Sequence, residues 1–361
     1  MKNDSKKKVA IFYSGGRYFG GIEQYLVDLF DNVNKNKIEL ELLSMGEWPL
    51  TNRLLKNRHK VTFLSQKRIS AKTIKLAGDY LISNDFDLLV SQGVVANAYA
   101  RSISLFYKIP NLVTVHSVMG GDYSSLLGRT VYKIIDKLTR FSTDSYIAVS
   151  EYLKSEMLKS GILKDKILVI YNGIKIRSSK PINNNMKIIG SVGRLHPTKG
   201  YDLLIQAFAK LDDKKVLLKI AGEGPELNRL VNLAVELGVA DRVEFVGFKK
   251  YIYEFLDSVD IYVQSSLTEG FGLSVVEAMS QGLPVVVTPA GSLKEIVKNR
   301  KTGIITKDLW PENIAAAIDD LLKDKDLANK ISKNAKEFVD NNFSMEKWVN
   351  MTTEAYKKAA K

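Results

Sequence analysis

Short apolar runs alternate with longer amphipathic segments along almost the whole chain. The runs are rich in β-branched residues, which is typical of strands buried in a sheet. In the first half they are Val9–Ser14, Ile38–Met45, Val61–Leu64, Asp87–Gly93, Asn111–His116, Ser145–Ser150 and Ile167–Asn172. Helical patterns lie between them, for example Gly21–Asn34, Ser70–Ser83, Tyr123–Phe141 and Glu151–Lys159. This alternation predicts βαβ units and a parallel sheet covered by helices on both faces.

The second half repeats the alternation. Its runs are Lys187–Arg194, Lys215–Gly222, Arg242–Gly247, Asp260–Ser266, Pro284–Pro289 and Thr302–Thr306. Between the halves, Asn172–Met186 is polar and carries neither pattern. We therefore predict two doubly wound, Rossmann-like α/β domains in tandem, residues 1–172 and 173–343, with a linker between them. Ligands of such sheets bind where the strand order reverses, so we expect the two switch points to face a common cleft.

The last segment, residues 344–361, has a helical pattern that contains Trp348 and Tyr356. We expect it to pack back on the first domain.

Composition narrows the class of protein. The 361 residues are 45% hydrophobic and 26% charged, which excludes wholesale disorder. The absence of cysteine excludes disulfides, thiolate zinc sites and a cysteine nucleophile, and the three histidines are too few for a histidine-rich metal centre. No apolar run approaches the roughly 18 residues that a membrane span needs, and Val9–Tyr13 is too short for the core of a signal peptide. We expect a cytoplasmic protein.

A glycine-rich segment follows the first predicted strand. Gly15, Gly16, Gly20 and Gly21 allow backbone amides to approach an anion at the start of the next helix. The segment lacks the G-x-G-x-x-G spacing and the Gly-Lys-Ser/Thr sequence, which disfavours a nicotinamide enzyme and a P-loop. On its own it also fits a plain turn.

Two cations follow the first strand of the second domain. Arg194 and Lys199 bracket a turn that contains Pro197 and leads into a predicted helix, Tyr201–Leu211. A guanidinium and an ammonium at a strand end can clamp a diphosphate. The same residues could equally be exposed loop charges.

Two carboxylates flank a glycine-rich helix start after the predicted strand Asp260–Ser266. Glu269 lies in the loop, Gly270 and Gly272 open the backbone, and Glu277 falls in the early turns of the helix. Amides at a helix start favour phosphate, and carboxylates accept hydrogen bonds from sugar hydroxyls. A capping role for Glu269 and a dipole role for Glu277 are the alternative, but the combination favours a ligand.

These motifs together resemble glycosyltransferase family 4, a family of retaining, nucleotide-sugar-dependent enzymes with the GT-B fold. Gly-Gly-x-Glu at Gly20–Glu23, Gly193-Arg194 with Lys199-Gly200, Ala-Gly-x-Gly-Pro at Ala221–Pro225, and Glu269-x7-Glu277 occur in the family's order. The resemblance covers essentially the whole chain and is most specific over residues 193–291.

The resemblance implies a role for each matching residue. Arg194 and Lys199 bind the donor diphosphate and stabilise charge on the leaving nucleotide, Glu277 holds the ribose hydroxyls, and Glu269 contacts the transferred sugar. The implied catalytic residues are His116, Glu269, Arg194 and Lys199. The implied donor-binding residues are Gly21, Arg194, Lys199, Gly270, Phe271, Gly272, Leu273 and Glu277.

We therefore expect a retaining transferase that moves a hexose or N-acetylhexosamine from a nucleotide diphosphate sugar, by default a UDP-sugar. The acceptor would be a saccharide or a polyprenyl-diphosphate-linked saccharide of a bacterial surface polysaccharide, such as a capsule or lipopolysaccharide. Fixed cations and a helix start stabilise the leaving anion. The resemblance thus implies an enzyme without cofactor or metal. The loop Arg17–Phe19 is expected to touch the acceptor.

The net charge of +13 is unevenly placed. Residues 1–180 hold 28 basic and 16 acidic residues, and the remainder is nearly balanced. We expect the basic residues Lys67, Arg68, Lys72 and Lys75 to face anionic lipid on the inner leaflet of the plasma membrane, or an acceptor. Helical spacing over Ile69–Ile82 predicts an apolar face made by Ile69, Thr73, Leu76 and Tyr80.

Two other interpretations stay open. A nucleotide-sugar epimerase would share the two-domain architecture and would consume its substrate without an acceptor. A nucleic-acid-binding protein would fit the charge, although no recognition element or row of stacking aromatics accompanies the cations. A surface that is merely lysine-rich and solvated would also fit the charge. We expect no nucleic-acid partner.

Overall fold

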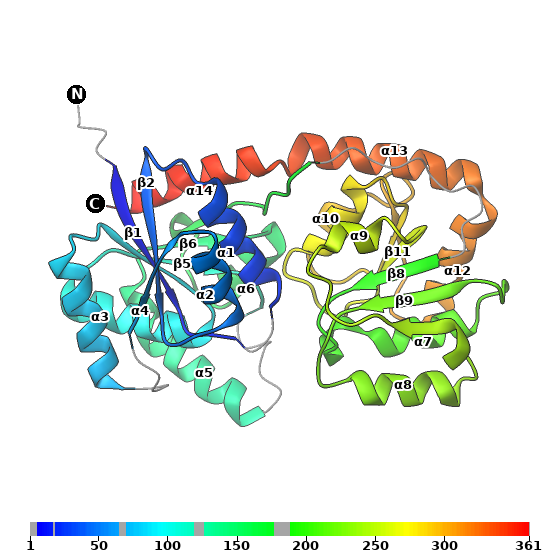
Figure 1. Ribbon diagram of the computed structural model, residues 1–361, viewed down its shortest axis with the longest axis horizontal. Helices are drawn as coiled ribbons and strands as arrows, with labels where there is room; N and C mark the ends of the chain where they lie inside the picture. The colour runs from blue at the N-terminus through cyan, green and yellow to red at the C-terminus, as the bar shows by residue number, and fades with distance from the viewer. Residues whose placement is uncertain (1–5, 17–18, 65–69, 119–125, 177–187, 361) are drawn as a thin grey trace. The chain divides into compact units, whose positions relative to one another are not determined.

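The computed structural model describes residues 6–16, 19–64, 70–118, 126–176 and 188–360. The chain forms two compact units (Figure 1). Unit 1 comprises Met1–Gly173 with Met345–Lys361, and unit 2 comprises Ile174–Ser344. Both divisions fall one residue beyond the boundaries expected from the sequence.

Unit 1 is built on a parallel sheet. In its described part, seven strands lie in the order β3-β2-β1-β4-β5-β6-β7. Their bounds are β1 (Lys7–Tyr13), β2 (Ile38–Ser44), β3 (Lys60–Phe63), β4 (Leu88–Gln92), β5 (Asn111–Val115), β6 (Ser145–Ala148) and β7 (Ile167–Val169). In the centre, Ile11 of β1 lies opposite Leu42 of β2 and Val90 of β4, and all three side chains are buried. Burial on both faces explains the nearly continuous apolar runs.

Helices cover both faces of this sheet and create two cores. The helical segments of unit 1 are α1 (Gly21–Asn32), α2 (Pro49–Lys56), α3 (Ala71–Ser83), α4 (Val94–Tyr107), α5 (Leu126–Thr139), η1 (Arg140–Ser142), α6 (Glu151–Lys159), η2 (Lys164–Lys166) and α14 (Met345–Ala359). One core joins α1 and the C-terminal helix α14 to the sheet, and Trp348 and Tyr356 are buried in it. The other core lies under α3 and α4.

The buried face of α3 differs from the predicted one. Thr73, Ala77 and Leu81 point inward, whereas Leu76 is 43% exposed, so its assignment to the apolar face was wrong. The reason is Gly78. A Cβ there would come within 2.1 Å of the Tyr107 ring, so the bare backbone lets α4 approach this side of the helix. That contact sets the rotation of α3.

Unit 2 repeats the architecture with six parallel strands in its described part, in the order β10-β9-β8-β11-β12-β13. The strands are β8 (Ile188–Val192), β9 (Leu217–Ala221), β10 (Val243–Phe245), β11 (Ile261–Gln264), β12 (Val285–Val287) and β13 (Ile304–Ile305). The helical segments are η3 (Pro197–Lys199), α7 (Tyr201–Ala209), α8 (Leu227–Glu236), η4 (Ala240–Arg242), α9 (Ile252–Leu256), α10 (Leu273–Ser280), α11 (Leu293–Ile296), α12 (Pro311–Lys323) and α13 (Lys325–Asn342).

The predicted fold class, two doubly wound α/β domains, is confirmed by these two sheets. Among the described residues, no helix combines the length and apolar character that crossing a membrane requires.

Candidate active site

The strand order of unit 2 reverses between β8 and β11, and the predicted residues of this domain follow these two strands. Chain connections diverge at such a point, which leaves room for a ligand beyond the carboxyl ends of the strands. Arg194 lies in the loop after β8, exposed, and has no ion pair among the residues that the structure describes. Lys199 ends η3 in the same loop and is partly buried.

Gly200 lets the two loops approach each other. Its φ is +60°, and a Cβ at this position would lie 2.2 Å from the carbonyl oxygen of Ser265. The Ser265 Oγ donates to the carbonyl of Lys199 at 3.1 Å, and the Leu267 N–H donates to the carbonyl of Thr198 at 2.8 Å. A side chain at 200 would therefore separate Lys199 from the segment after β11.

Lys199 reaches Glu269 across this approach. Its Nζ lies 2.7 Å from Glu269 Oε2, and the glutamate side chain is only 12% exposed. Ser266 Oγ donates to the same carboxylate oxygen at 3.1 Å. The structure thus brings together a cation and a carboxylate that are 70 residues apart in the chain.

A buried row of hydrogen-bonded polar side chains holds Glu269 in place. The Tyr262 hydroxyl donates to Gln264 Oε1 at 2.8 Å, and Gln264 Nε2 donates to Ser266 Oγ at 2.7 Å. Burial raises the pKa of Tyr262, and the negative charges of Glu277 and Glu269 raise it further. The row of hydrogen bonds therefore reaches from Tyr262 to Glu269 through Gln264 and Ser266.

The helix start between the two carboxylates is held open by glycine. Gly272 caps α10 with φ +90°, and the helix runs from Leu273 to Ser280. Ser292 Oγ donates to the carbonyl of Phe271 at 2.9 Å and fixes the loop that Gly270 begins. The first amides of α10 have no partner within the helix and can bind a phosphate. Glu277 is partly buried on the second turn.

The two predicted residues of unit 1 also stand at the carboxyl edge of their sheet. Gly21 is the first residue of α1, and a Cβ added to it would meet nothing within 4 Å. His116 directly follows β5 and packs edge-on against the Tyr25 ring, with ring centroids 4.7 Å apart.

Burial lowers the pKa of His116 to about 3, so the imidazole is neutral at pH 7. Its Nε2 lies 2.9 Å from Gln92 Oε1, an atom that can only accept a hydrogen bond. Nε2–H therefore donates to Gln92, and Nδ1 is left as an acceptor. His116 in this state can orient a hydroxyl but cannot act as an acid.

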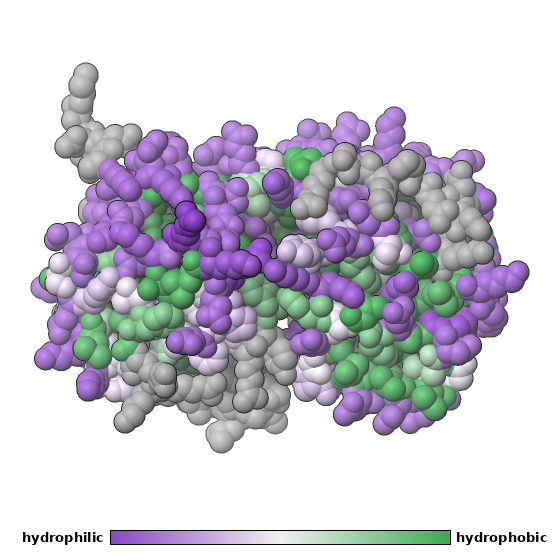
Figure 2. Space-filling view, viewed as in Figure 1, coloured by the Kyte–Doolittle hydropathy of each residue, from purple (hydrophilic) through white to green (hydrophobic). Residues whose placement is uncertain are grey.

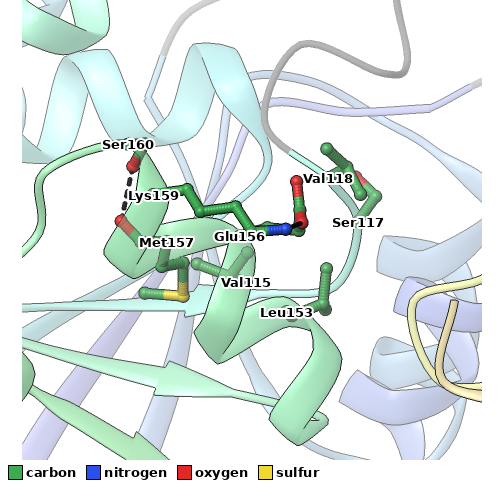
Figure 3. A pocket seen from close by; sticks show the side chains of 8 residues that line it. All are labelled: Val115, Ser117, Val118, Leu153, Glu156, Met157, Lys159 and Ser160. Carbon is green, nitrogen blue, oxygen red and sulfur yellow. Dashed lines mark hydrogen bonds and ion pairs between the residues drawn. The ribbon is translucent and has the colours of Figure 1, made fainter.

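A cavity of about 270 Å³ lies between the end of β5 and α6 in unit 1 (Figure 3). Apolar side chains of Val115, Leu153 and Met157 line it, and the ion pair of Lys159 with Glu156, at 2.6 Å, lies along one side. The remaining lining residues are Ser117, Val118 and Ser160. The cavity combines an apolar wall with polar groups at the carboxyl end of β5, and His116 is not among its lining residues.

Some predicted residues are not part of these clusters. Lys72 and Lys75 are exposed on α3. Lys67 and Arg68, and Arg17 and Tyr18 of the predicted acceptor loop, lie outside the described residues. Within the described part of the chain, no group of three or more His, Asp or Glu side chains is arranged to hold a metal ion.

Sequence reasoning missed Gln92, Gln264 and Ser266. Each lies at or just beyond the end of a strand, next to a predicted residue. A signal was present, because a glutamine ends each of the otherwise largely apolar runs at β4 and β11. Such a polar side chain at a strand's carboxyl end is a candidate for the site.

Two sequence-family models match the chain in succession. The model of Glycosyltransferase Family 4 matches residues 19–177, and that of Glycosyl transferases group 1 matches residues 173–338. The chain belongs to glycosyltransferase family 4. The matches to the two models cover both domains, including both groups of candidate residues, so the chain is a glycosyltransferase.

Individual proteins that resemble this glycosyltransferase are also named glycosyltransferases or share its fold. An uncharacterised glycosyltransferase of Methanocaldococcus jannaschii is 28% identical over 94% of this chain and 95% of that protein. The lipopolysaccharide core biosynthesis glycosyltransferase LpsE of Rhizobium meliloti is 33% identical over 44% of this chain and 46% of its own length. The solved structure of Anabaena HepE in complex with UDP-glucose superposes with a TM-score of 0.85 at 21% identity, covering 97% of this chain and 99% of that one. The structural likeness shows the GT-B fold.

Proposed function

We propose that this glycosyltransferase takes a hexose or N-acetylhexosamine from a UDP-sugar and transfers it with retention of anomeric configuration. The observation that carries the proposal is the contact of Lys199 with Glu269 beside the start of α10, at the switch point of unit 2. A cation, a carboxylate and free helix amides are what a diphosphate linked to a polyhydroxylated sugar requires. The UDP-glucose in the HepE structure supports uridine as the base.

The chemistry of the leaving group indicates what each residue of the site does. As the bond between the anomeric carbon and the diphosphate oxygen breaks, UDP departs with the electron pair. Arg194, Lys199 and the amides of α10 stabilise the growing charge. Lys199 has three N–H donors, so it can contact a phosphate while keeping its bond to Glu269. Glu269 is then fixed to accept hydrogen bonds from the sugar, and Glu277 from the ribose.

Retention follows from attack on the face that the diphosphate leaves. The acceptor hydroxyl gives its electron pair to the anomeric carbon and its proton to the departing phosphate oxygen, through an oxocarbenium-like transition state. Neutral His116 contributes an acceptor, Nδ1, for a sugar hydroxyl, and Gly21 leaves space for the donor phosphates. No step calls for a metal. We therefore expect transfer to persist in the presence of a chelator.

For the acceptor, we propose a saccharide or a polyprenyl-diphosphate-linked saccharide of a bacterial surface polysaccharide. The name of the relative LpsE supports this class. The cavity between β5 and α6 offers an apolar wall and polar groups for part of such an acceptor. Lys72 and Lys75 are exposed and available to an anionic inner leaflet, so we propose a peripheral membrane enzyme.

A thermal-shift panel tests the donor. UDP and UDP-sugars should raise the melting temperature, because a ligand at about 100 times its dissociation constant adds roughly 2.7 kcal/mol of stability. GDP and ADP serve as controls for the base. Stability that no nucleoside diphosphate or nucleotide sugar changes would refute the donor site. With an acceptor absent, conversion of the sugar to its epimer would instead reveal an epimerase.

A further inference from the structure

The described side chains of helix α5 (labelled in Figure 1) expose apolar groups and bury a carboxylate, the reverse of an ordinary surface helix. Ile134, Leu138 and Phe141, the last in η1 just beyond α5, follow one another at spacings that put them on one face. Their side chains point to solvent, with Leu138 66% and Phe141 67% exposed. Asp136, on the opposite side, is buried. The helix thus presents a carboxylate to the protein and hydrocarbon to water.

A buried ion pair holds α5 in this orientation. Arg101 of α4, almost fully buried, places its Nη1 2.8 Å from Asp136 Oδ1 and donates from Nε to Thr143 Oγ1 at 2.9 Å. Arg140 pairs with the other oxygen of Asp136. Rotating the helix to hide its apolar side would leave a buried arginine without its counter-charge, which is strongly unfavourable. The exposed apolar side is therefore built into the fold.

Neighbouring segments enlarge this surface. α4 packs against α5 and η1 and ends in exposed Leu105 and Phe106. The Lys166 Nζ of η2 donates to the carbonyl of Thr143 at 2.8 Å, which holds η2 and exposed Leu163 next to η1. We call the following six residues the α5 face: Leu105, Phe106, Ile134, Leu138, Phe141 and Leu163. The ends of α4, η1 and η2 directly precede β5, β6 and β7, so the α5 face lies toward the amino edge of the sheet, away from His116.

The charges around the α5 face are mainly positive. Lys108, Lys137 and Lys164 are exposed in or next to these segments, and the exposed acids there are Asp144 and Asp165. Large apolar side chains flanked by lysines are the pattern of a helix that lies in the interface of an anionic bilayer. Pairing two copies through this face would bring lysines together.

We propose that the α5 face docks on an anionic lipid surface, with Leu138 and Phe141 entering the headgroup region and the lysines contacting lipid phosphates. This docking proposal depends on the proposed function in one respect, namely that the acceptor is linked to a membrane lipid. It relocates the principal membrane contact from the lysines of α3 to α5.

A second apolar strip provides the internal control. In unit 2, Leu227, Val231 and Val235 recur every fourth residue of α8 and are exposed, and Figure 2 shows apolar side chains over this helix. Val235 is 61% exposed, close to the value for Leu138. The charged residues of α8, Arg229 and Glu236, balance each other. If exposed hydrocarbon alone were enough, α8 would enter the membrane equally well.

The absence of cysteine makes the experiment clean. Leu138→Cys, Phe141→Cys, Val235→Cys and Leu76→Cys each carry one environment-sensitive fluorophore. The probes are vesicles of phosphatidylcholine with and without phosphatidylglycerol. We expect labels at 138 and 141 to shift to shorter emission wavelength with the anionic vesicles, whereas labels at 235 and 76 stay in water. Replacing Leu138 and Phe141 together by serine should weaken vesicle binding by at least about tenfold.

Three results would overturn the proposal: no vesicle binding, binding with the 138 label still in water, or a shift at 138 that grows with protein concentration when vesicles are absent. The last would mean that a second copy covers the face. The double serine variant is also tested for UDP binding and for transfer to a soluble acceptor. If UDP binding and transfer persist while vesicle binding is absent even in the wild type, the membrane proposal has failed and the proposed function has not. If the wild type neither binds UDP nor transfers the sugar, the proposed function has failed.

Discussion

Replacing Lys199 with methionine keeps the length of the side chain and removes its charge. The Glu269 carboxylate, 12% exposed, then keeps the hydrogen bond from Ser266 Oγ but loses the counter-charge of Lys199. Breaking a fully buried ion pair costs about 3–5 kcal/mol. Because the Lys199 side chain is itself 23% exposed, we expect a smaller loss of folding free energy, about 1–3 kcal/mol.

The same change should impair the reaction through a different cause. Removing one preorganised group that stabilises developing charge typically lowers kcat by about 10²–10³. The double variant Lys199→Met with Glu269→Gln separates the two effects. It should regain most of the lost stability, since no unpaired carboxylate remains, while transfer stays low because neither group can act on the donor.

Calorimetric unfolding and a steady-state transfer assay measure the two effects. A matched control is Lys210→Met, because Lys210 pairs with Glu312 at 2.9 Å but both side chains are about half exposed. That pair should contribute under about 1 kcal/mol and leave transfer unchanged. The reasoning fails if Lys199→Met unfolds at the wild-type temperature and retains activity, or if the double variant is as unstable as the single one.

Three further predictions follow from contacts of the site. Gly200→Ala should lower the melting temperature and weaken UDP binding together, since its Cβ would meet a backbone carbonyl at 2.2 Å; unchanged titration and melting curves would contradict this. Gln264→Leu should lower kcat more than it raises KM for the donor, because it frees Ser266 and Glu269 without touching the diphosphate; a change confined to KM would contradict that role. For His116, the pKa of about 3 in the folded chain lies below the unfolded value near 6.5, so the unfolded chain binds the extra proton. The free energy of unfolding should therefore fall as the pH drops below 6.5, by up to about 1.4 kcal/mol per pH unit. Denaturation curves of the wild type and of His116→Gln should diverge between pH 7 and pH 5, and parallel behaviour would refute this linkage.

Much of the fold was accessible from the sequence because parallel sheets buried on both faces leave a strong pattern. Each apolar run that was taken as a strand is one, usually within two or three residues at each end. Rotation of a helix was harder to predict. Leu76 was placed on the wrong side of α3 because the deciding contact is Tyr107 against Gly78, which no periodicity reveals.

The candidate site was only partly accessible. Motif spacing pointed to Lys199 and to Glu269, but their contact depends on β8 and β11 becoming neighbours in the sheet. Gln264 and Ser266 were missed because their part is to hold Glu269, not to form a motif. The exposed side of α5 was missed for a related reason, since its orientation depends on Arg101 of another helix.

The central claim is that Lys199, Glu269 and the start of α10 hold a UDP-sugar. Calorimetric titration of UDP and a UDP-sugar into the wild-type chain, Lys199→Met and Glu269→Ala tests it most directly. We predict that Lys199→Met weakens binding of both ligands by tenfold or more, and that Glu269→Ala leaves UDP binding nearly unchanged but abolishes transfer. Equal affinities in all three proteins, or no binding to the wild type, would contradict the claim.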